Sequence, residues 1–545
     1  MKKKTVFTTL LILLIVITQF ISCIKEKSCE GCVNGNQPPV ANAGKDTLIT
    51  LPANTVTLDG SASSDPDNDI LSYKWTKISG PASYTFSNSN TVQTQVSNLE
   101  EGVYLIELKV TDATGLFDSD TIQITVDAAI SICNGLTIQW QKKLGGVSYE
   151  PYEQDWYYPC SILPTTDGGY MLAGTSDGGA SGGQEGILLI KLNSAGTIEW
   201  QKLLGGSWID QFYSVQATMD GGYVLAGYTN SNDGDVVENH GELDLWLVKL
   251  SNTGVIQWQK SLGGSSVEEN ASVKQTADGG FILAGYTDSN DGDISGNHGN
   301  YDWWIIKLNG SGVIQWQKTL GGSGNDWGNI SVDITADGGY ILAGTTSSND
   351  GDVSGNHGGD DAWLVKLNNN GEIQWERTLG GSGNDNAYSI EHTTDGGFIL
   401  AGGTNSTDGN VTGNHGGDDA WLVKLDANGN IQWQRTLGGL SNDYIYSAQQ
   451  TKDGGYILIG GANSTDGDLS GNYGSTDLWL VKLTNSGDTQ WQKSLGGTGF
   501  DIGISVLQTT DEGFLLAGYS DSKDGDVKGS YDRNDIWVIK VKECQ

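Results

Sequence analysis

A unit of about 58 residues recurs seven times between residue 138 and the end of the chain, and this repeat limits the possible folds more than any other feature. Each copy contains IQWQKTLGG or a close variant, a segment that ends in Asp-Gly-Gly, then YILAG and WLVKL. The tryptophan of the first element stands at Trp140, Trp200, Trp258, Trp316, Trp375, Trp433 and Trp491. Such repeats fold into one structural unit each and bury their apolar faces against their neighbours.

Every copy supplies four short apolar segments, which predict four β-strands: A before Asp-Gly-Gly, B at YILAG, C at WLVKL and D at IQWQKTL. The Asp-Gly-Gly turns predict two-residue hairpins that need positive φ. Glycine numbers 79 and tryptophan 18, against 8 prolines and 3 methionines, which favours short strands and tight turns over helices. We therefore expect an all-β chain in which residues 133–545 form a seven-bladed β-propeller, since a β-helix rung would be far shorter.

The repeat begins on a D strand and ends on a C strand, so the propeller must close by pairing its two ends. We predict that strand D at residues 138–144 pairs antiparallel with strand C at residues 536–542. Cys133 and Cys544 flank these strands and are predicted to form a disulfide that closes a very long loop. Cys160 is then a buried or free thiol.

Residues 1–23 have a basic start, an apolar stretch and a small residue before Cys23, which is typical of an export signal. The stretch FISC resembles the lipobox of bacterial lipoproteins, and this resemblance implies that Cys23 is lipidated. An uncleaved membrane helix is the alternative, but polar residues shorten the apolar core below the ~20 residues that spanning needs. We expect a protein anchored by lipid in the cell envelope, at the outer membrane or cell surface, with residues 24–37 as a polar linker.

Residues 38–128 alternate apolar residues with turn clusters at the spacing of a β-sandwich, with Trp75 and Tyr104 as expected core aromatics. The segments PPVANAG, LDGSASSDPDNDILSYKW and YLIELKVTD resemble a PKD domain. The resemblance implies an Ig-like sandwich that acts as a spacer or contacts protein or carbohydrate. The acidic group Asp65, Asp67 and Asp69 could chelate calcium, although Asx turns explain such clusters more often.

The formal charge of −36 makes nucleic acid an unlikely partner, because the protein repels phosphate backbones. The same charge attracts divalent cations or basic ligands, although it also simply keeps the surface soluble. The repeat itself resembles glycine-rich propeller repeats of exported bacterial proteins of unassigned function. That resemblance implies a fold and an exposed location, and no substrate.

The long D–A and B–C loops share one face of a propeller, which we call the loop face. An acidic residue follows each LGG there, and the seven could bind a cation, but capping of the amides in the Gly-Gly bend is the favoured role. These acids are Glu150, Asp210, Glu268, Asp326, Asp385, Asp443 and Asp501.

The B–C loops carry aspartates at alternating positions, as calcium loops do, although the complete EF-hand pattern is missing. Possible Ca²⁺ ligands are the pairs Asp233 with Asp235, Asp291 with Asp293, Asp350 with Asp352, and Asp466 with Asp468. Plain Asx and glycine turns are the alternative. Histidines 240, 298, 357 and 415 recur in the same loops, and we expect them to pack the loop rather than share one metal.

One D–A loop breaks the repeat with the segment YEPYEQDWYYPC at residues 149–160. Aromatic faces with carboxylates suit sugar rings or a peptide, so this loop is the predicted ligand site, with a hydrophobic plug as the alternative. Its candidate residues are Tyr149, Tyr152, Glu153, Asp155, Trp156, Tyr157 and Tyr158.

Together these features predict a surface module that binds or adheres to a glycan or a protein. A propeller-type polysaccharide hydrolase or lyase is the first alternative, and it would need Glu153 or Asp155 to work with His392. A purely structural envelope protein is the second alternative. No nucleophile elbow, zinc motif or phosphate loop is present in the sequence.

Overall fold

A computed structural model describes residues 36–50, 54–100, 102–127, 136–144, 159–176, 186–469, 471–528 and 535–543. Every regular element in these ranges is a β-strand, as the sequence predicts. Within them, no helix combines the length and the apolar character that crossing a membrane requires. The leader with Cys23 and the predicted partners Cys133 and Cys544 lie outside the described residues.

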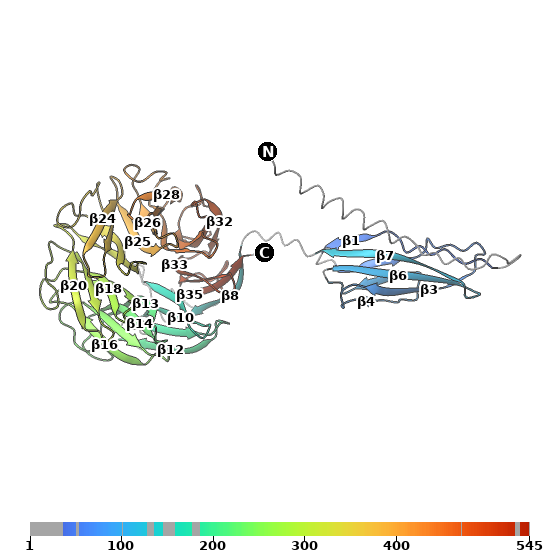
Figure 1. The fold of residues 1–545 in the computed structure, drawn as a ribbon, viewed down its shortest axis with the longest axis horizontal. Helices are drawn as coiled ribbons and strands as arrows, with labels where there is room; N and C mark the ends of the chain where they lie inside the picture. Colours follow the sequence, from blue (N-terminus) through green and yellow to red (C-terminus); the bar gives the residue numbers. More distant parts are fainter. Residues whose placement is uncertain are drawn as a thin grey trace. The chain divides into compact units, whose positions relative to one another are not determined.

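The chain divides into two compact units, residues 1–132 and 133–545 (Figure 1). The first unit is a sandwich of two sheets. One sheet has the order β1 (Thr47–Thr50), β7 (Phe117–Asp127), β6 (Gly102–Asp112), β3 (Ile70–Ser79), and the other has the order β2 (Val56–Asp59), β5 (Gln93–Ser97), β4 (Thr85–Phe86). Trp75 and Tyr104 are buried in its core, which confirms the prediction for both residues.

The second unit consists of seven four-stranded sheets, each with its A strand at one edge and its D strand at the other. The A strands are β9 (Cys160–Pro164), β13 (Asp210–Ala217), β17 (Glu268–Gln275), β21 (Asp326–Ile334), β25 (Asp385–His392), β29 (Asp443–Gln450) and β33 (Asp501–Gln508). The B strands are β10 (Tyr170–Ser176), β14 (Tyr223–Thr229), β18 (Phe281–Thr287), β22 (Tyr340–Thr346), β26 (Phe398–Thr404), β30 (Tyr456–Ala462) and β34 (Phe514–Ser520).

The C strands are β11 (Gly186–Leu192), β15 (Asp244–Leu250), β19 (Asp302–Leu308), β23 (Asp361–Leu367), β27 (Asp419–Leu425), β31 (Asp477–Leu483) and β35 (Asp535–Glu543). The D strands are β12 (Ile198–Leu204), β16 (Ile256–Leu262), β20 (Ile314–Leu320), β24 (Ile373–Leu379), β28 (Ile431–Leu437), β32 (Thr489–Leu495) and β8 (Leu136–Leu144). We number the blades 1 to 7 from the one that starts with β9.

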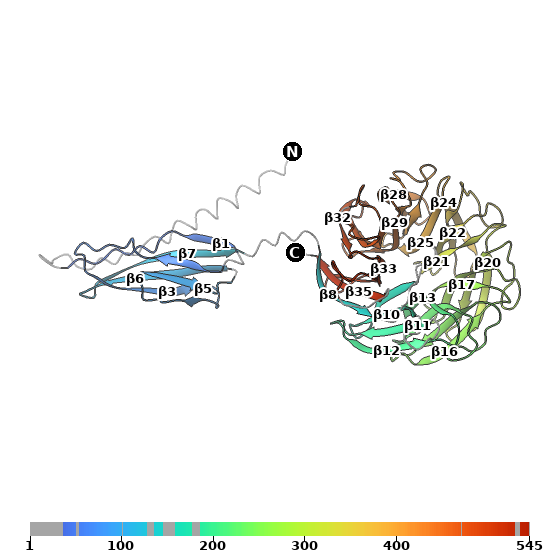
Figure 2. The same cartoon turned by 180° about the vertical axis from the view of Figure 1, so that it is seen from behind.

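The sheets stand around a central axis, and each A strand contacts the A strands of both neighbouring blades, including β9 with β33 (Figures 1 and 2). The seven blades therefore form a closed ring. The B strands are buried along their length between blades. The D-strand tryptophans pack at the rim, as Trp316 does against Tyr340 of the next blade, with ring centroids 6.1 Å apart.

The last blade joins both ends of the propeller. Strand β8 pairs antiparallel with β35, with Ile138 opposite Val541 and Leu144 opposite Ile536. The predicted closure is thus confirmed. Cys160, at the start of β9, is a buried free thiol, and burial raises the pKa of that thiol.

The Asp-Gly-Gly turns differ from the prediction. In blade 2 the N–H of Thr218 donates to the Gly222 carbonyl (2.9 Å), so the loop is longer than two residues, and the first glycine, Gly221, has the positive φ (79°). The aspartate carboxylate anchors this wider turn, because Asp220 accepts hydrogen bonds from Gly222 N (3.1 Å) and from Lys249 Nζ (2.8 Å). All seven blades repeat this lysine–aspartate pair between strand C and the turn.

Candidate functional site

Two cavities follow the central channel of the propeller, with volumes of about 820 and 490 Å³. The larger is lined by the starts of A strands, the ends of B strands and the loops between them, so it opens at the loop face. The smaller is lined by the middle and the ends of the A strands. Tyr213, Asn329, Tyr388, Tyr446 and Ile504 line both cavities, so the two adjoin along the channel.

The larger cavity is rich in aromatic rings and carboxamides. Its aromatic residues are Tyr213, Tyr228, Tyr286, Trp327, Tyr388, Tyr444, Tyr446, Phe500 and Tyr519. Its carboxamides are Gln211, Asn270, Asn329, Asn384, Asn386, Asn405 and Asn463. Among the described residues of this lining, the charged side chains are Glu269 and Asp418, and none is a lysine, arginine or histidine. Such a surface offers flat apolar faces beside neutral donors and acceptors.

Hydrogen bonds hold several of these side chains in place. Tyr286 Oη donates to Glu269 (2.6 Å), and Tyr444 Oη donates to Asp418 (2.7 Å). Tyr444 stacks on Tyr446, with ring centroids 6.1 Å apart and planes at 25°. Trp327 keeps 40% of its surface exposed. The cavity therefore presents ordered rings with at least one accessible aromatic face.

Irregular strand pairing gives the channel wall its side chains. The A strand pairs with the B strand through a register shift in blades 2 to 7, for instance between Glu269 and Ser272 and between Trp327 and Ser331. Asn270 has a φ of 62° within one of these bulges. A bulge interrupts the alternation of a strand and re-aims its side chains. Each blade can thus present a different residue to the channel without disturbing the sheet behind it.

A serine from every A strand lines the smaller cavity: Ser161, Ser214, Ser272, Ser331, Ser389, Ser447 and Ser505. Several of these hydroxyls accept a backbone N–H from the next blade, as Ser214 does from Val273 (3.2 Å) and Ser331 does from Ile390 (3.2 Å). Most of this ring therefore ties neighbouring blades together.

The ring symmetry is broken below the serines. His392 Nδ1 lies 2.6 Å from Asp333, whose other oxygen lies 3.6 Å from Lys274 Nζ. Burial raises the pKa of the neighbouring Glu391 to about 7. His392, which the sequence leaves alone on an inner strand, is in fact one member of a charged cluster from three consecutive blades.

The acidic residues that follow each LGG cap the Gly-Gly bend, which confirms the favoured prediction for the six that the structure describes. Asp326 is typical, because its carboxylate accepts hydrogen bonds from Gly322 N (2.7 Å) and Ser348 Oγ (2.8 Å) and is fully buried. Equivalent bonds to the second glycine are made by Asp210, Glu268, Asp385, Asp443 and Asp501. Glu150 lies outside the described residues.

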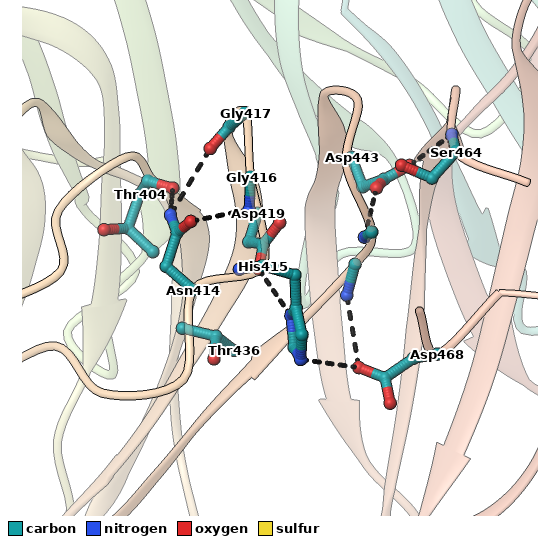
Figure 3. A network of polar contacts seen from close by, with 12 residues as sticks. Thr404, Asn414, His415, Gly416, Gly417, Asp419, Thr436, Asp443, Ser464 and Asp468 are labelled. Atoms are coloured by element: carbon teal, nitrogen blue, oxygen red, sulfur yellow. Dashed lines mark hydrogen bonds and ion pairs between the residues drawn. The ribbon is translucent and has the colours of Figure 1, made fainter. Parts of the chain in front are cut away.

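The repeated histidines belong to networks at the junctions between blades. Figure 3 shows the junction of blades 5 and 6, where His415 Nδ1 lies 2.8 Å from the buried Asp419 and His415 Nε2 lies 3.9 Å from Asp468 of the next blade. His240, His298 and His357 bond in the same way to Asp244, Asp302 and Asp361. The histidines therefore pack the loops, as the sequence predicts.

A second carboxylate faces each of these junctions. At the junction of blades 3 and 4, a Cβ on Gly321 would stand 2.5 Å from Asp302 Oδ1 and 2.6 Å from Asp326 Oδ2. Two buried carboxylates from adjacent blades thus approach the same glycine, which explains why the LGG element needs a residue without a side chain. Burial raises the pKa of both carboxyls.

The predicted calcium pairs of the B–C loops bond to backbone amides. The first aspartate of each pair, Asp233, Asp291, Asp350 or Asp466, accepts an N–H just after the Gly-Gly bend at 2.6 to 2.9 Å. The second, Asp235, Asp293, Asp352 or Asp468, accepts a longer bond from the first glycine at 3.3 to 3.4 Å. Calcium binding by these pairs stays a prediction.

A denser acidic group lies in the first unit. Ligand oxygens of Asp65, Asp69 and Asp112 lie within 4.8 Å of one another, and this is the one such group of three among the described residues. Asp65 is 7% exposed, and its Oδ2 and the Oδ1 of Asp69 are buried without a hydrogen-bond partner. Desolvation, followed by repulsion from Asp65 and Asp112, raises the pKa of Asp69. Oxygen-only donors with unsatisfied charge fit Ca²⁺.

The structure changes the membership of that group. The sequence associates Asp67 with Asp65 and Asp69, but Asp67 accepts a hydrogen bond from the N–H of Gln37 (2.6 Å). Asp112, at the end of β6, takes its place, and the chain from 69 to 112 must fold before this is visible. The aromatic residues predicted to bind ligand, Tyr149, Tyr152, Glu153, Asp155, Trp156, Tyr157 and Tyr158, lie outside the described residues.

Comparison with known proteins identifies the first unit. Residues 43–126 match a family of PKD domains that is named after the KIAA0319-like protein. Low-density lipoprotein receptor-related protein 11 of Mus musculus is 41% identical over 92 residues, which are 17% of this chain and 19% of that protein. The Dyslexia-associated protein KIAA0319 homolog of Rattus norvegicus is 45% identical over 94 residues, 17% of this chain and 9% of that protein. This chain thus covers less than a fifth of the curated relatives it matches.

Solved structures resemble each unit separately. The solution structure of the PKD domain from the KIAA 1837 protein is 35% identical, covers 18% of this chain and 96% of that one, and has a TM-score of 0.16. BBS1N in complex with ARL6DN is 12% identical, covers 74% of this chain and 96% of that one, and has a TM-score of 0.41. Residues 43–126 are therefore a PKD domain, and the repeats that follow it form a β-propeller.

Proposed function

We propose that this chain is an exported, lipid-anchored surface protein whose propeller binds carbohydrate in the larger cavity at the loop face. The observation that carries the proposal is the lining of tyrosines, Trp327 and carboxamides around about 820 Å³. A sugar ring has apolar faces that stack on aromatic rings and a rim of hydroxyls that bond to carboxamides. The anchor and the cell-surface location rest on the sequence of residues 1–23, with the PKD domain as a spacer.

The lining favours sugar over the other ligand classes that the sequence leaves open. A protein partner would need a broad contact surface, whereas these aromatic residues gather around a concave site. A nucleic acid would need basic side chains, and the described residues of this lining include none.

The test is a glycan array with the soluble chain lacking residues 1–23, followed by calorimetry on any sugar that binds. Trp327→Ala should weaken binding by about 2 kcal/mol or more if Trp327 is a stacking anchor. Trp208→Ala is the matched control, because Trp208 is an exposed tryptophan (59%) that does not line the cavity. Unchanged binding in Trp327→Ala and in a Tyr388→Ala variant would contradict the proposed site.

The aromatic segment predicted from sequence has its own arm in this experiment. Pro159, the first described residue after that segment, accepts a hydrogen bond from Tyr519 of the cavity lining (3.3 Å). Trp156→Ala should weaken the same sugar if the segment contributes to binding. If Trp156→Ala binds normally while Trp327→Ala does not, the channel alone holds the ligand.

We also propose that Asp65, Asp69 and Asp112 bind Ca²⁺ in the PKD domain. The buried, unpartnered oxygens of Asp65 and Asp69 support this proposal, because a bound cation would give them partners. Terbium luminescence of the soluble chain, with displacement by Ca²⁺, tests it. Absence of a calcium-displaceable signal would contradict the proposal.

A further inference from the structure

The charge of the larger cavity is one-sided. Glu269 and Asp418 line it, and no lysine, arginine or histidine among the described lining residues offsets them. Each carboxylate accepts one tyrosine hydroxyl, Tyr286 to Glu269 and Tyr444 to Asp418, which leaves its second oxygen available to a ligand. The whole chain adds to this field with a formal charge of −36. An anionic ligand would therefore be repelled from the site, and a cationic one attracted.

The aromatic residues beside these carboxylates suit the same charge. Tyr286 meets Tyr301 edge to face at 5.2 Å, and Tyr444 stacks on Tyr446. The face of an aromatic ring attracts cations, and this attraction grows where water is excluded. Burial raises the pKa of Glu269, so its charge is poorly solvated, and an ammonium group would supply what water does not.

The two carboxylates come from different blades with an aromatic ring between them in blade order. Glu269 lies on β17 of blade 3, Trp327 lies on β21 of blade 4, and Asp418 lies just before β27 of blade 5. A sugar chain stacked on Trp327 would extend toward a carboxylate on either side along the channel wall. A single charged group would need one carboxylate, whereas a chain with an amine on each sugar unit can use both.

We propose that the ligand of the larger cavity is an oligosaccharide of amino sugars with free ammonium groups, held by Glu269 and Asp418 and stacked on Trp327. The proposal rests on the proposed function of this cavity and adds the charge of its ligand. It excludes uronic-acid polymers, and it ranks neutral sugars as weaker ligands.

Calorimetry with three oligosaccharide probes tests this proposal on the soluble chain at pH 6 and low salt. Glucosamine hexamer should bind at least ten times more tightly than N-acetylglucosamine hexamer, and galacturonic acid hexamer should not bind. Added salt should reduce the difference between the first two probes, because it screens charge.

Two isosteric variants carry the decisive comparison. Glu269→Gln and Asp418→Asn should each lower the preference for the glucosamine hexamer several-fold and leave binding of the N-acetylated hexamer nearly unchanged. Glu372→Gln is the control, because Glu372 lies in an exposed turn away from the cavity. Melting curves of all three variants establish that each is folded.

The outcomes separate this inference from the proposed function. Equal binding of both hexamers, or a preference that survives both variants, would overturn the inference and leave a carbohydrate site in place. The same holds if a neutral or anionic sugar on the array binds through Trp327 and the glucosamine hexamer does not. If no carbohydrate of any charge binds, the proposed function fails together with the inference.

Discussion

The ammonium of Lys143 lies 3.8 Å from the carboxylate of Asp535, and both side chains are almost fully buried. Lys143 is at the end of β8, the first strand of the propeller, and Asp535 begins β35, the last. This ion pair therefore joins the two ends of the ring inside the blade that they build together. Its burial means that losing one partner would strand the other charge away from water.

The closing blade gives the first prediction. A chain truncated after Asp535 loses β35, which pairs with both β34 and β8, so the ring opens and the whole propeller should melt at a much lower temperature. Calorimetric melting of the soluble chain measures this. Truncation that leaves the melting temperature unchanged would show that the blade is dispensable.

The buried ion pair gives the second prediction. Lys143→Met should destabilise the propeller by about 3 kcal/mol, because Asp535 is left as a buried charge without its lysine. Lys142→Met, at the more exposed neighbouring position, should stay within about 0.5 kcal/mol. Urea unfolding of both variants makes the comparison, and equal effects would count against the ion pair.

The third prediction concerns acid. A hydrogen bond from Thr276 and, against some desolvation, bonds from Gly280 and Lys307 lower the pKa of Asp278 to about 2, and the other Asp–Gly turns repeat this. A lowered carboxyl pKa adds stability above the unfolded value near 4. Unfolding free energy should therefore fall as the pH drops from 4 toward 2. A flat profile in urea melts over that range would contradict this.

The buried acids predict the opposite trend at higher pH. Burial raises the pKa of Glu268 to about 7 and that of Asp477 to about 6. A raised carboxyl pKa stabilises the fold below the unfolded value, and this stability is lost as the pH rises through the folded value. Stability should thus decline from about pH 4.5 to pH 7, and Glu268→Gln should reduce that decline. An unchanged slope in the variant would exclude Glu268 as a source.

The repeated rim tryptophans give the last prediction. Trp316 packs against Tyr340 of the next blade and lies beside Gly371, where a Cβ would stand 2.9 Å from its ring. Trp316→Ala should cost about 3 kcal/mol, because it leaves a space between two blades. Binding of any ligand should persist at a temperature where the variant is folded. Trp208→Ala, at an exposed position, should leave stability unchanged.

The sequence by itself determined the local features and their repetition. Strand periodicity, turn residues and the register of the tryptophans act over a few residues, so they were sufficient for seven blades, the closure of β8 on β35 and the capping role of Asp326. The turn geometry was missed because Asp-Gly-Gly suits more than one hairpin, and the lysine that anchors the aspartate comes from another strand.

Tertiary structure alone decided which side chains meet in the channel and in the acidic group. Tyr213 donates a hydrogen bond to Asn329, 116 residues away and two blades further round the ring, and no spacing in the sequence marks that pair. Asp112 likewise joins Asp65 and Asp69 only when β6 packs in the sandwich. Positions that are equivalent in every blade face one axis, so the closed ring, rather than any single repeat, assembles Glu269, Trp327 and Asp418 into one cavity.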